Sequence, residues 1–209
     1  MDIFLIRHGE SVGNREGKLQ GWLDSPLTEK GRHQAEVTAN RLASAGIEQI
    51  YTSPLSRALD TARLMAERIG CEADELELLK EIDVGSAEGL TIDEVERIYP
   101  DHVIDLVGKK RGDASFPGGE TIDQFHDRAA RAWEKLIRHD SFGAIACVSH
   151  GWMINALLKR AQGLPLSTTN LVFANGAIQH LRSEKGRWKI IKLETVKNVT
   201  PAMRVWQLF

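Results

Sequence analysis

Two histidines stand where an α/β protein would place its active site. His8 follows the apolar run of residues 3–6, and His150 follows the apolar run of residues 144–148. Short apolar runs of this kind predict buried strands. Ligands of open α/β sheets bind at the carboxyl ends of the strands, so both imidazoles are expected to face one crevice. The residue after each histidine is a glycine, which would let a ligand approach the backbone.

Two arginines accompany these histidines. Arg7 precedes His8, and Arg57 lies in the first turn of a helix that the pair Ser53-Pro54 is expected to open as N-cap and first-turn residue. A guanidinium group binds phosphate or carboxylate through paired hydrogen bonds. Helix N-termini would add backbone donors and a favourable dipole. Together these groups predict a site for a doubly charged anion such as a phosphate ester.

Other uses of the same residue types are poorly supported. The sequence contains neither a His-Glu-x-x-His pair nor a Cys-x-x-Cys pair, and neighbouring arginines would repel a cation, so no metal or cofactor is expected. Ser149 does not lie in a Gly-x-Ser-x-Gly elbow. The glycine-flanked stretch of residues 108–112 lacks the spacing of a P-loop.

Composition indicates a single domain that acts on a small molecule. The chain has 209 residues, of which 42% are hydrophobic, enough for one ordinary core. Its 27 basic and 29 acidic residues disfavour a nucleic-acid partner. No apolar run approaches the roughly 18 residues of a membrane span, and the N-terminus lacks the basic region of a secretory signal. Cys71 and Cys147 do not suggest a disulfide framework, so a cytoplasmic location is expected.

The elements that must position these residues alternate between strand and helix. This alternation predicts one three-layer α/β domain over residues 1–209, with a mostly parallel central sheet flanked by helices. Strands are expected at residues 3–6, 47–52, 76–79, 144–148, 171–181 and 188–195. Helices are expected at residues 28–45, after Ser53, after the capping boxes that begin at Thr91 and Thr121, and at residues 151–161.

Two segments are expected to lie outside this regular pattern. Residues 82–119 are rich in Gly, Asp and Lys, and they predict an excursion over the active-site face that acts as a lid and sets substrate specificity. Within it, Lys109, Lys110 and Arg111 are interpreted as a solvated charge run, with a reduced basic grip as the alternative. The apolar tail, residues 199–209, is expected to dock on its own core, although a dimer contact would also fit, so a monomer or a homodimer is expected.

The motifs resemble those of the histidine phosphatase superfamily, also called phosphoglycerate-mutase-like. Arg7-His8-Gly9-Glu10 looks like the family signature, and Asn14 stands where the family pattern expects an asparagine. Further stretches follow in the family's order and span most of the chain. They are Gly21-Trp22-Leu23-Asp24-Ser25-Pro26-Leu27-Thr28, Thr52-Ser53-Pro54-Leu55-Ser56-Arg57-Ala58, Leu79-Lys80-Glu81-Ile82-Asp83-Val84-Gly85, Glu88-Gly89, Pro117-Gly118-Gly119-Glu120-Thr121 and Ser149-His150-Gly151.

The resemblance implies a role for each residue of the site. His8 would attack phosphorus and become a phosphohistidine, for which its imidazole must be neutral with one nitrogen free. The phosphoryl oxygens would be bound by Arg7, Arg57 and His150. The substrate-binding residues would be Asn14, Gln20, Gly21 and Gly151.

The same resemblance assigns Glu81 as the proton donor and acceptor. Glu81 would protonate the leaving oxygen and then activate water, which requires a carboxyl pKa raised by partial burial or by a nearby anion. Family members need no metal, so none is implied here.

The reaction expected from the resemblance is the hydrolysis of a small phosphate ester. The short chain and the acid motif Glu81-Ile82-Asp83-Val84-Gly85, where mutases more often have Glu-Arg-x-Tyr-Gly, look like the phosphatase branch. A cofactor-dependent phosphoglycerate mutase is the alternative, and a non-catalytic phospholigand-binding protein is a remote one. Candidate substrates are phosphoserine, the nucleotide-loop precursor of cobalamin, phosphoglycerates and sugar phosphates.

Overall fold

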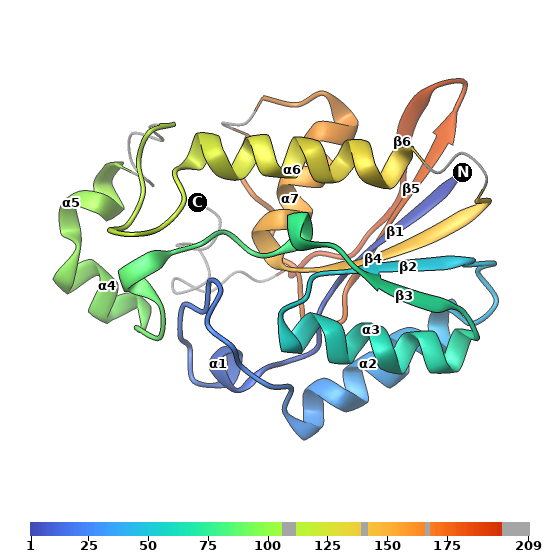
Figure 1. Ribbon diagram of the computed structural model, residues 1–209, viewed down its shortest axis with the longest axis horizontal. Coiled ribbons are helices and arrows are strands. Elements are labelled where there is room, and N and C mark those ends of the chain that lie inside the picture. The colour runs from blue at the N-terminus through green and yellow to red at the C-terminus, as the bar shows by residue number, and fades with distance from the viewer. Residues whose placement is uncertain (106–111, 139–141, 166–167, 198–209) are drawn as a thin grey trace.

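A computed structural model of the chain describes residues 1–105, 112–138, 142–165 and 168–197 (Figure 1). Its centre is a six-stranded sheet with the order β3-β2-β4-β1-β5-β6. The strands are β1 (Asp2–Arg7), β2 (Gln49–Thr52), β3 (Glu72–Glu75), β4 (Ala144–Ser149), β5 (Ile178–Glu184) and β6 (Arg187–Leu193). The first four are parallel, while β5 and β6 add an antiparallel hairpin at one edge.

The two central strands are apolar because helices cover both faces of the sheet. Every residue of β4 and the middle four residues of β1 are buried. Both strands therefore read as continuous hydrophobic runs, as expected for a parallel sheet. They pair in parallel, with Arg7 opposite Ser149. As a consequence, His8 and His150 leave the sheet side by side at its carboxyl end.

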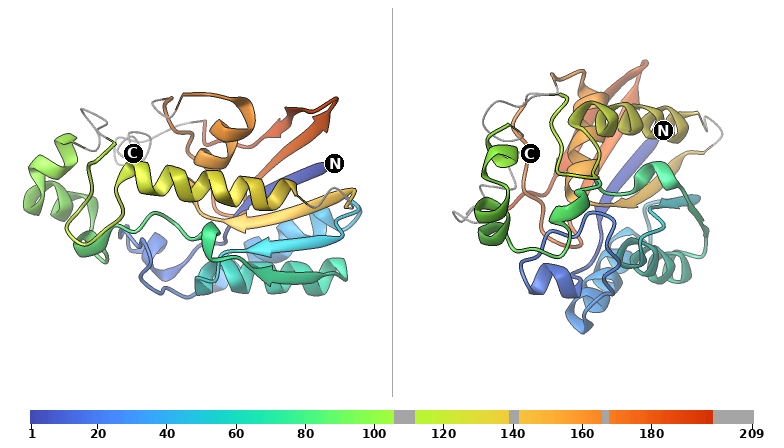
Figure 2. Two further views of the ribbon diagram at one scale, coloured as in Figure 1. Left: turned by 45° about the horizontal axis from the view of Figure 1, so that its top comes forward. Right: turned by 60° about the vertical axis from the view of Figure 1, so that its left-hand side comes forward.

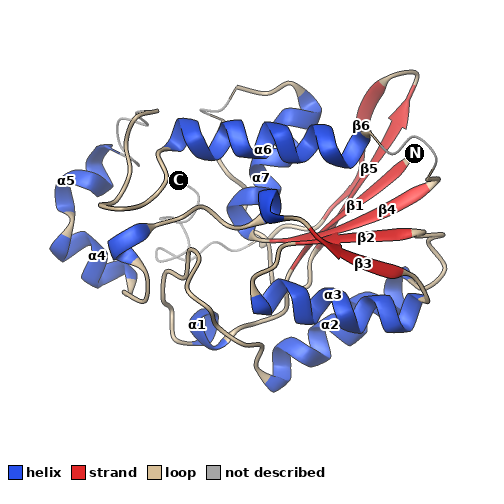
Figure 3. Cartoon of the chain, in the orientation of Figure 1, coloured by secondary structure: helices blue, strands red, loops and turns tan. Residues whose placement is uncertain are grey.

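The helices form the two outer layers. One face is covered by α2 (Glu29–Leu42) and α3 (Ser56–Ile69), and the other by α6 (Ile122–Ile137) and α7 (Gly151–Gln162) (Figure 2). Shorter elements lie beyond the carboxyl ends of the strands or lead toward them (Figure 3). They are α1 (Val12–Arg15), η1 (Glu77–Leu79), η2 (Gly85–Ala87), α4 (Ile92–Ile98) and α5 (Pro100–Val103).

The predicted three-layer α/β architecture is confirmed, along with much of its local detail. The capping boxes at Thr91 and Thr121 are both present and begin α4 and α6. Gly70 ends α3 in the left-handed conformation, with φ of 84°. The hairpin between β5 and β6 turns at Lys185 and Gly186, both with positive φ.

Three local predictions are wrong. The third strand occupies Glu72–Glu75 instead of residues 76–79, whose last three form the 3₁₀ helix η1, because edge pairing with β2 selects the polar segment. Helix α3 begins after Leu55, and Ser53 does not serve as its N-cap. The predicted strand over residues 171–181 is a strand only from Ile178, because the preceding residues line the pocket described below.

The excursion predicted over residues 82–119 contains η2, α4 and α5, and it lies at the carboxyl end of the sheet (Figures 1 and 2). Its role as a lid stays a prediction. The basic run at residues 109–111 and the apolar tail from residue 199 lie outside the described residues. Within the described part of the chain, no helix is long and apolar enough to cross a membrane.

A close backbone contact joins the loop after β1 to the start of α2. A Cβ atom at Gly31 would overlap the carbonyl oxygen of Glu10, and one at Gly9 would overlap the carbonyl oxygen of Gly31. Alanine normally stabilises a helix interior by about 1 kcal/mol relative to glycine. Here the overlap with backbone should outweigh that gain.

We therefore expect Gly31→Ala to lower the free energy of unfolding by about 2 kcal/mol, measured by urea denaturation. The exposed neighbour Arg32 provides the control, since Arg32→Ala should change stability by no more than about 0.5 kcal/mol. A Gly31→Ala protein as stable as the parent would show that the backbone contact is not constrained.

Candidate active site

His8 is a neutral imidazole held in one tautomer. Its ring is buried, with 3% of the residue exposed, and Nδ1 lies 2.7 Å from the carbonyl oxygen of Gly9. A carbonyl only accepts hydrogen bonds, so Nδ1 carries the proton and Nε2 keeps a free lone pair. Burial, followed by the nearby guanidinium groups of Arg57 and Arg7, holds the pKa of His8 well below its usual value.

His150 packs against His8, but it is bound through Nε2 instead of Nδ1. The two ring centroids are 5.0 Å apart, and His150 is 1% exposed. The Ser53 hydroxyl accepts from the amide of Leu55, so its own proton is available for Nε2 of His150, 2.8 Å away. With the Ser53 hydroxyl as the donor to Nε2, the imidazole proton lies on Nδ1. Burial, followed by the charges of Arg57, His8 and Arg7, lowers the pKa of His150 well below its usual value.

Three buried nitrogen atoms around these rings have no hydrogen-bond partner among the described residues: Nε of Arg7, Nε of Arg57 and Nδ1 of His150. Buried donors are nearly always satisfied, so unpaired ones at one place call for an acceptor from outside the protein. Each guanidinium group is also anchored to backbone carbonyls. Arg7 donates to the carbonyl of Phe173, and Arg57 to those of Gly21 and Leu23.

Glu81 supplies a buried carboxyl group whose pKa is shifted upward, whereas the pKa values of the two histidines are shifted downward. Its oxygens accept from the amides of Trp152 and Met153 at the start of α7, each at 3.2 Å, and from its own neighbour Ile82. Burial nevertheless raises the pKa of Glu81 above its usual value, against the lowering effects of these amides and of Arg57. A carboxyl group in this environment can hold a proton more readily than one in water.

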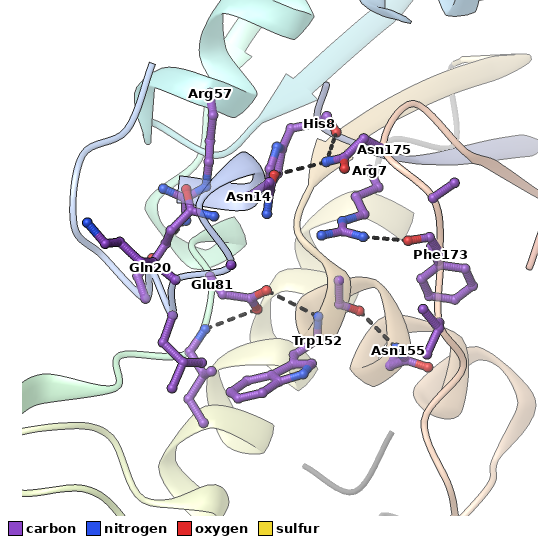
Figure 4. A pocket seen from close by; sticks show the side chains of 18 of the residues that line it. Arg7, His8, Asn14, Gln20, Arg57, Glu81, Trp152, Asn155, Phe173 and Asn175 are labelled. Carbon is purple, nitrogen blue, oxygen red and sulfur yellow. Dashed lines mark hydrogen bonds between the residues drawn. The ribbon is translucent and has the colours of Figure 1, made fainter. Parts of the chain in front are cut away.

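These side chains line one cavity of about 390 Å³. Figure 4 shows Glu81 across the cavity from His8, with the guanidinium groups of Arg7 and Arg57 on either side. Of the nine residues predicted from the sequence, eight line this cavity, and His150 lies against the ring of His8. The eight are Arg7, His8, Asn14, Gln20, Gly21, Arg57, Glu81 and Gly151.

The side-chain amides of Asn14 and Gln20 are oriented by hydrogen bonds to Ser11 and Asn175. Oδ1 of Asn14 accepts from the backbone amide of Ser11 and from Nδ2 of Asn175. This leaves the NH₂ group of Asn14 as its donor toward the cavity. Oε1 of Gln20 accepts from the Ser11 hydroxyl at 2.7 Å, which likewise leaves its NH₂ group for a ligand.

Two expectations about backbone groups are corrected. Gly9 is a glycine because Gly31 packs against it, and it does not line the cavity, whereas Gly151 does. The two helix starts meet at the site, but protein carboxylates take up several of their amides. Glu81 binds the first turn of α7, and Asp24 accepts from the first amide of α3 at 3.4 Å. The free donors for an anion are therefore mainly side chains.

Sequence reasoning missed three residues of the site. Ser53 was expected to cap a helix but binds His150, and Asn175 follows no strand or motif that would draw attention to it. Arg128 lies on the buried face of α6 and donates to the carbonyl of Glu81. A charged residue on an otherwise apolar helix face was the available signal for Arg128.

The fold and the site define an α/β protein with two buried histidines, two arginines and a carboxyl group gathered at the carboxyl end of its sheet. Residues 3–195 match the histidine phosphatase superfamily (branch 1), and the chain belongs to this family. It is 31% identical over 192 residues to a probable phosphoglycerate mutase GpmB of Serratia proteamaculans, covering 90% of this chain and 87% of that protein. The resemblance inferred from the motifs is confirmed.

Solved structures of phosphatases are similar along nearly the whole chain. A mycobacterial glucosyl-3-phosphoglycerate phosphatase has 25% identity and a TM-score of 0.82, with 93% of this chain and 99% of that chain covered. A variant of phosphoserine phosphatase from Entamoeba histolytica, in complex with phosphoserine, has 27% identity and a TM-score of 0.79, with 91% and 95% covered. The superfamily therefore includes both phosphatases and mutases among the relatives of this chain.

The tautomer of His150 can be tested through Ser53. Ser53→Ala should lower kcat/KM for a phosphate ester by about tenfold, the loss expected for one hydrogen bond to a buried group. Nitrogen-15 NMR of the histidines in the parent should show the proton of His150 on Nδ1. Ser56→Ala is the control, because the buried Ser56 hydroxyl has no partner among the described residues. A proton on Nε2 of His150 would contradict the assignment.

Proposed function

We propose that this chain is a metal-independent phosphatase that hydrolyses small phosphomonoesters through a phosphohistidine on His8. One observation carries the proposal. The buried ring of His8, with Nδ1 bound to the carbonyl of Gly9, lines one cavity together with Arg7 and Arg57. Among the described residues, Nε of each arginine and Nδ1 of His150, whose ring packs against His8, have no hydrogen-bond partner. A nucleophile beside donors for an anion is what in-line phosphoryl transfer requires.

In the first half-reaction, the lone pair of His8 Nε2 attacks phosphorus and the bond from phosphorus to the ester oxygen breaks. The leaving oxygen takes the proton of the Glu81 carboxyl group and departs as an alcohol. Guanidinium groups and Nδ1–H of His150 stabilise the negative charge on the three peripheral oxygens. The raised pKa of Glu81 and the lowered pKa of His8 suit the acid and the nucleophile respectively.

In the second half-reaction, water attacks the phosphohistidine. The carboxylate of Glu81 accepts a proton from this water, the bond from phosphorus to Nε2 breaks, and inorganic phosphate leaves. The amide of Asn14 and that of Gln20 supply further donors to the phosphoryl group. Charge neutralisation by arginine replaces the role that a metal ion plays in other phosphoryl-transfer sites. Within the described residues, no group of three or more His, Cys, Asp or Glu side chains could hold a metal ion.

The cavity beyond the phosphate site favours hydrolysis over a phosphoglycerate mutase. A mutase must hold the carboxylate of its substrate and shield the phosphoenzyme from water. The lysines that line the cavity, Lys18 and Lys30, are paired with Glu16 and Glu10 at 2.9 and 2.7 Å. Much of the remaining wall is apolar, formed by Leu19, Ile82, Val84, Trp152, Leu171, Val172, Phe173 and Val196.

A phosphate-release screen tests the reaction. Phosphoserine, 3-phosphoglycerate, a sugar phosphate and an aryl phosphate should give phosphate in excess chelator, with little isomerisation of 3-phosphoglycerate in the presence of a bisphosphoglycerate primer. His8→Ala should abolish release and leave the fold intact. Isomerisation faster than release would make the protein a mutase. Loss of activity in chelator that added metal restores would contradict the metal-free mechanism.

The acid role of Glu81 predicts a dependence on the leaving group. Glu81→Gln should lower kcat/KM for phenyl phosphate by about 100-fold or more, and change kcat/KM for 2,4-dinitrophenyl phosphate little, since that phenolate leaves without a proton. The decline of kcat/KM at high pH, where Glu81 loses its proton, should disappear in the variant. Equal losses for both esters would remove Glu81 from the acid role.

A further inference from the structure

The segment that carries Glu81 has no regular structure to hold it. Residues 80–84 lie in neither helix nor strand, between η1 and η2. Side chains from other elements bind its carbonyl groups instead. The hydroxyl of Ser149 donates to the carbonyl of Leu79 at 2.7 Å, and the indole of Trp22 donates to that of Glu81 at 2.7 Å. The position of the acid therefore depends on tertiary contacts.

Arg128 makes the largest set of these contacts. Its Nη1 donates to the carbonyls of Leu78 at 3.0 Å and Lys80 at 2.7 Å, and its Nη2 donates to the carbonyl of Glu81 at 2.9 Å. Nε and Nη2 bind the two carboxylate oxygens of Glu120 at 2.8 and 2.6 Å. All five N–H groups of the guanidinium group thus have acceptors.

Glu120 extends the same network to the other side of the acid. Its Oε2 accepts from the amide of Asp83 at 3.0 Å, and its own amide donates to the carbonyl of Asp83. Arg128 and Glu120 therefore form hydrogen bonds with the main chain both before and after Ile82. Arg128 is itself 7% exposed. Its Cζ atom lies 5.3 Å from the ring centroid of Phe125, a contact that restrains the guanidinium group.

The contribution of Arg128 is one of position more than of charge. Burial raises the pKa of Glu81, and the cations that act against it are Arg57 and Arg7, on the opposite side of the carboxyl group. Arg128 binds backbone carbonyls of the acid segment and leaves the carboxyl oxygens to the amides of α7. Its N–H groups therefore fix the position of the main chain at Glu81, from which the carboxyl side chain extends.

We infer that Arg128, held by Glu120, is a positioning residue for the general acid. It fixes the main chain of residues 78–83 so that the carboxyl group of Glu81 stays at the start of α7, facing the leaving oxygen. This inference rests on the proposed role of Glu81. Lysine cannot substitute, because an ammonium group keeps the charge but offers three donors in place of a five-donor fork.

The test compares Arg128→Lys with the parent on two esters. For phenyl phosphate, which needs the acid, kcat/KM should fall by about 10- to 100-fold. For 2,4-dinitrophenyl phosphate, which does not, it should change by less than about twofold. Arg131→Lys is the matched control, because Arg131 is an exposed residue of the same helix. It should behave as the parent on both esters.

A double-mutant cycle separates positioning from general damage. In the Glu81→Gln background, Arg128→Lys should have no further effect on phenyl phosphate, because the acid through which it acts is gone. Additive losses, or equal losses on both esters, would overturn the inference and leave the phosphatase intact. A parent enzyme inactive on both esters would refute the proposed function instead. Glu120→Gln, which keeps Arg128, carries the same test if Arg128→Lys fails to fold.

Discussion

The site depends on burying positive groups around imidazoles that must stay neutral. Parallel pairing of β1 with β4 brings His8 and His150 together, and α3 adds Arg57 beside Arg7. Burial and the two guanidinium groups lower the pKa values of both histidines. The same desolvation leaves donors without partners, so the pocket favours a ligand with several negative oxygens. Under the proposed function, the nucleophile and the anion site thus have a common physical origin.

Burial also shifts the pKa of Glu81, but upward, because the charged form of a carboxyl group is the deprotonated one. It raises the pKa of Glu81, whereas it lowers that of His8, so one pocket favours the protonated form of a carboxyl group and the neutral form of an imidazole. The amides at the start of α7 orient the Glu81 carboxyl group, and Arg128 with Glu120 holds the main chain beneath it. His8 with Arg7, Arg57, Glu81 and His150 come from four separate stretches of the chain.

Local patterns predicted most of the frame. Apolar runs located β1 and β4, and threonine capping boxes located α4 and α6, because these signals depend on neighbouring residues alone. The third strand was misplaced because an edge strand such as β3 is selected by pairing with β2 and carries polar residues. Ser53 was misassigned because its hydroxyl binds a residue 97 positions away.

Residue type, spacing and family resemblance were enough to identify which residues gather at the site, namely the histidines after two central strands, the arginines and Glu81. Tertiary structure alone decided how they work together. It placed the carbonyl of Gly9 and the hydroxyl of Ser53 against nitrogens of His8 and His150, and it bound carboxylates at the helix starts. It also placed Arg128 behind the acid. Hydrogen bonds and desolvation depend on distances between segments remote in the chain, which no local pattern encodes.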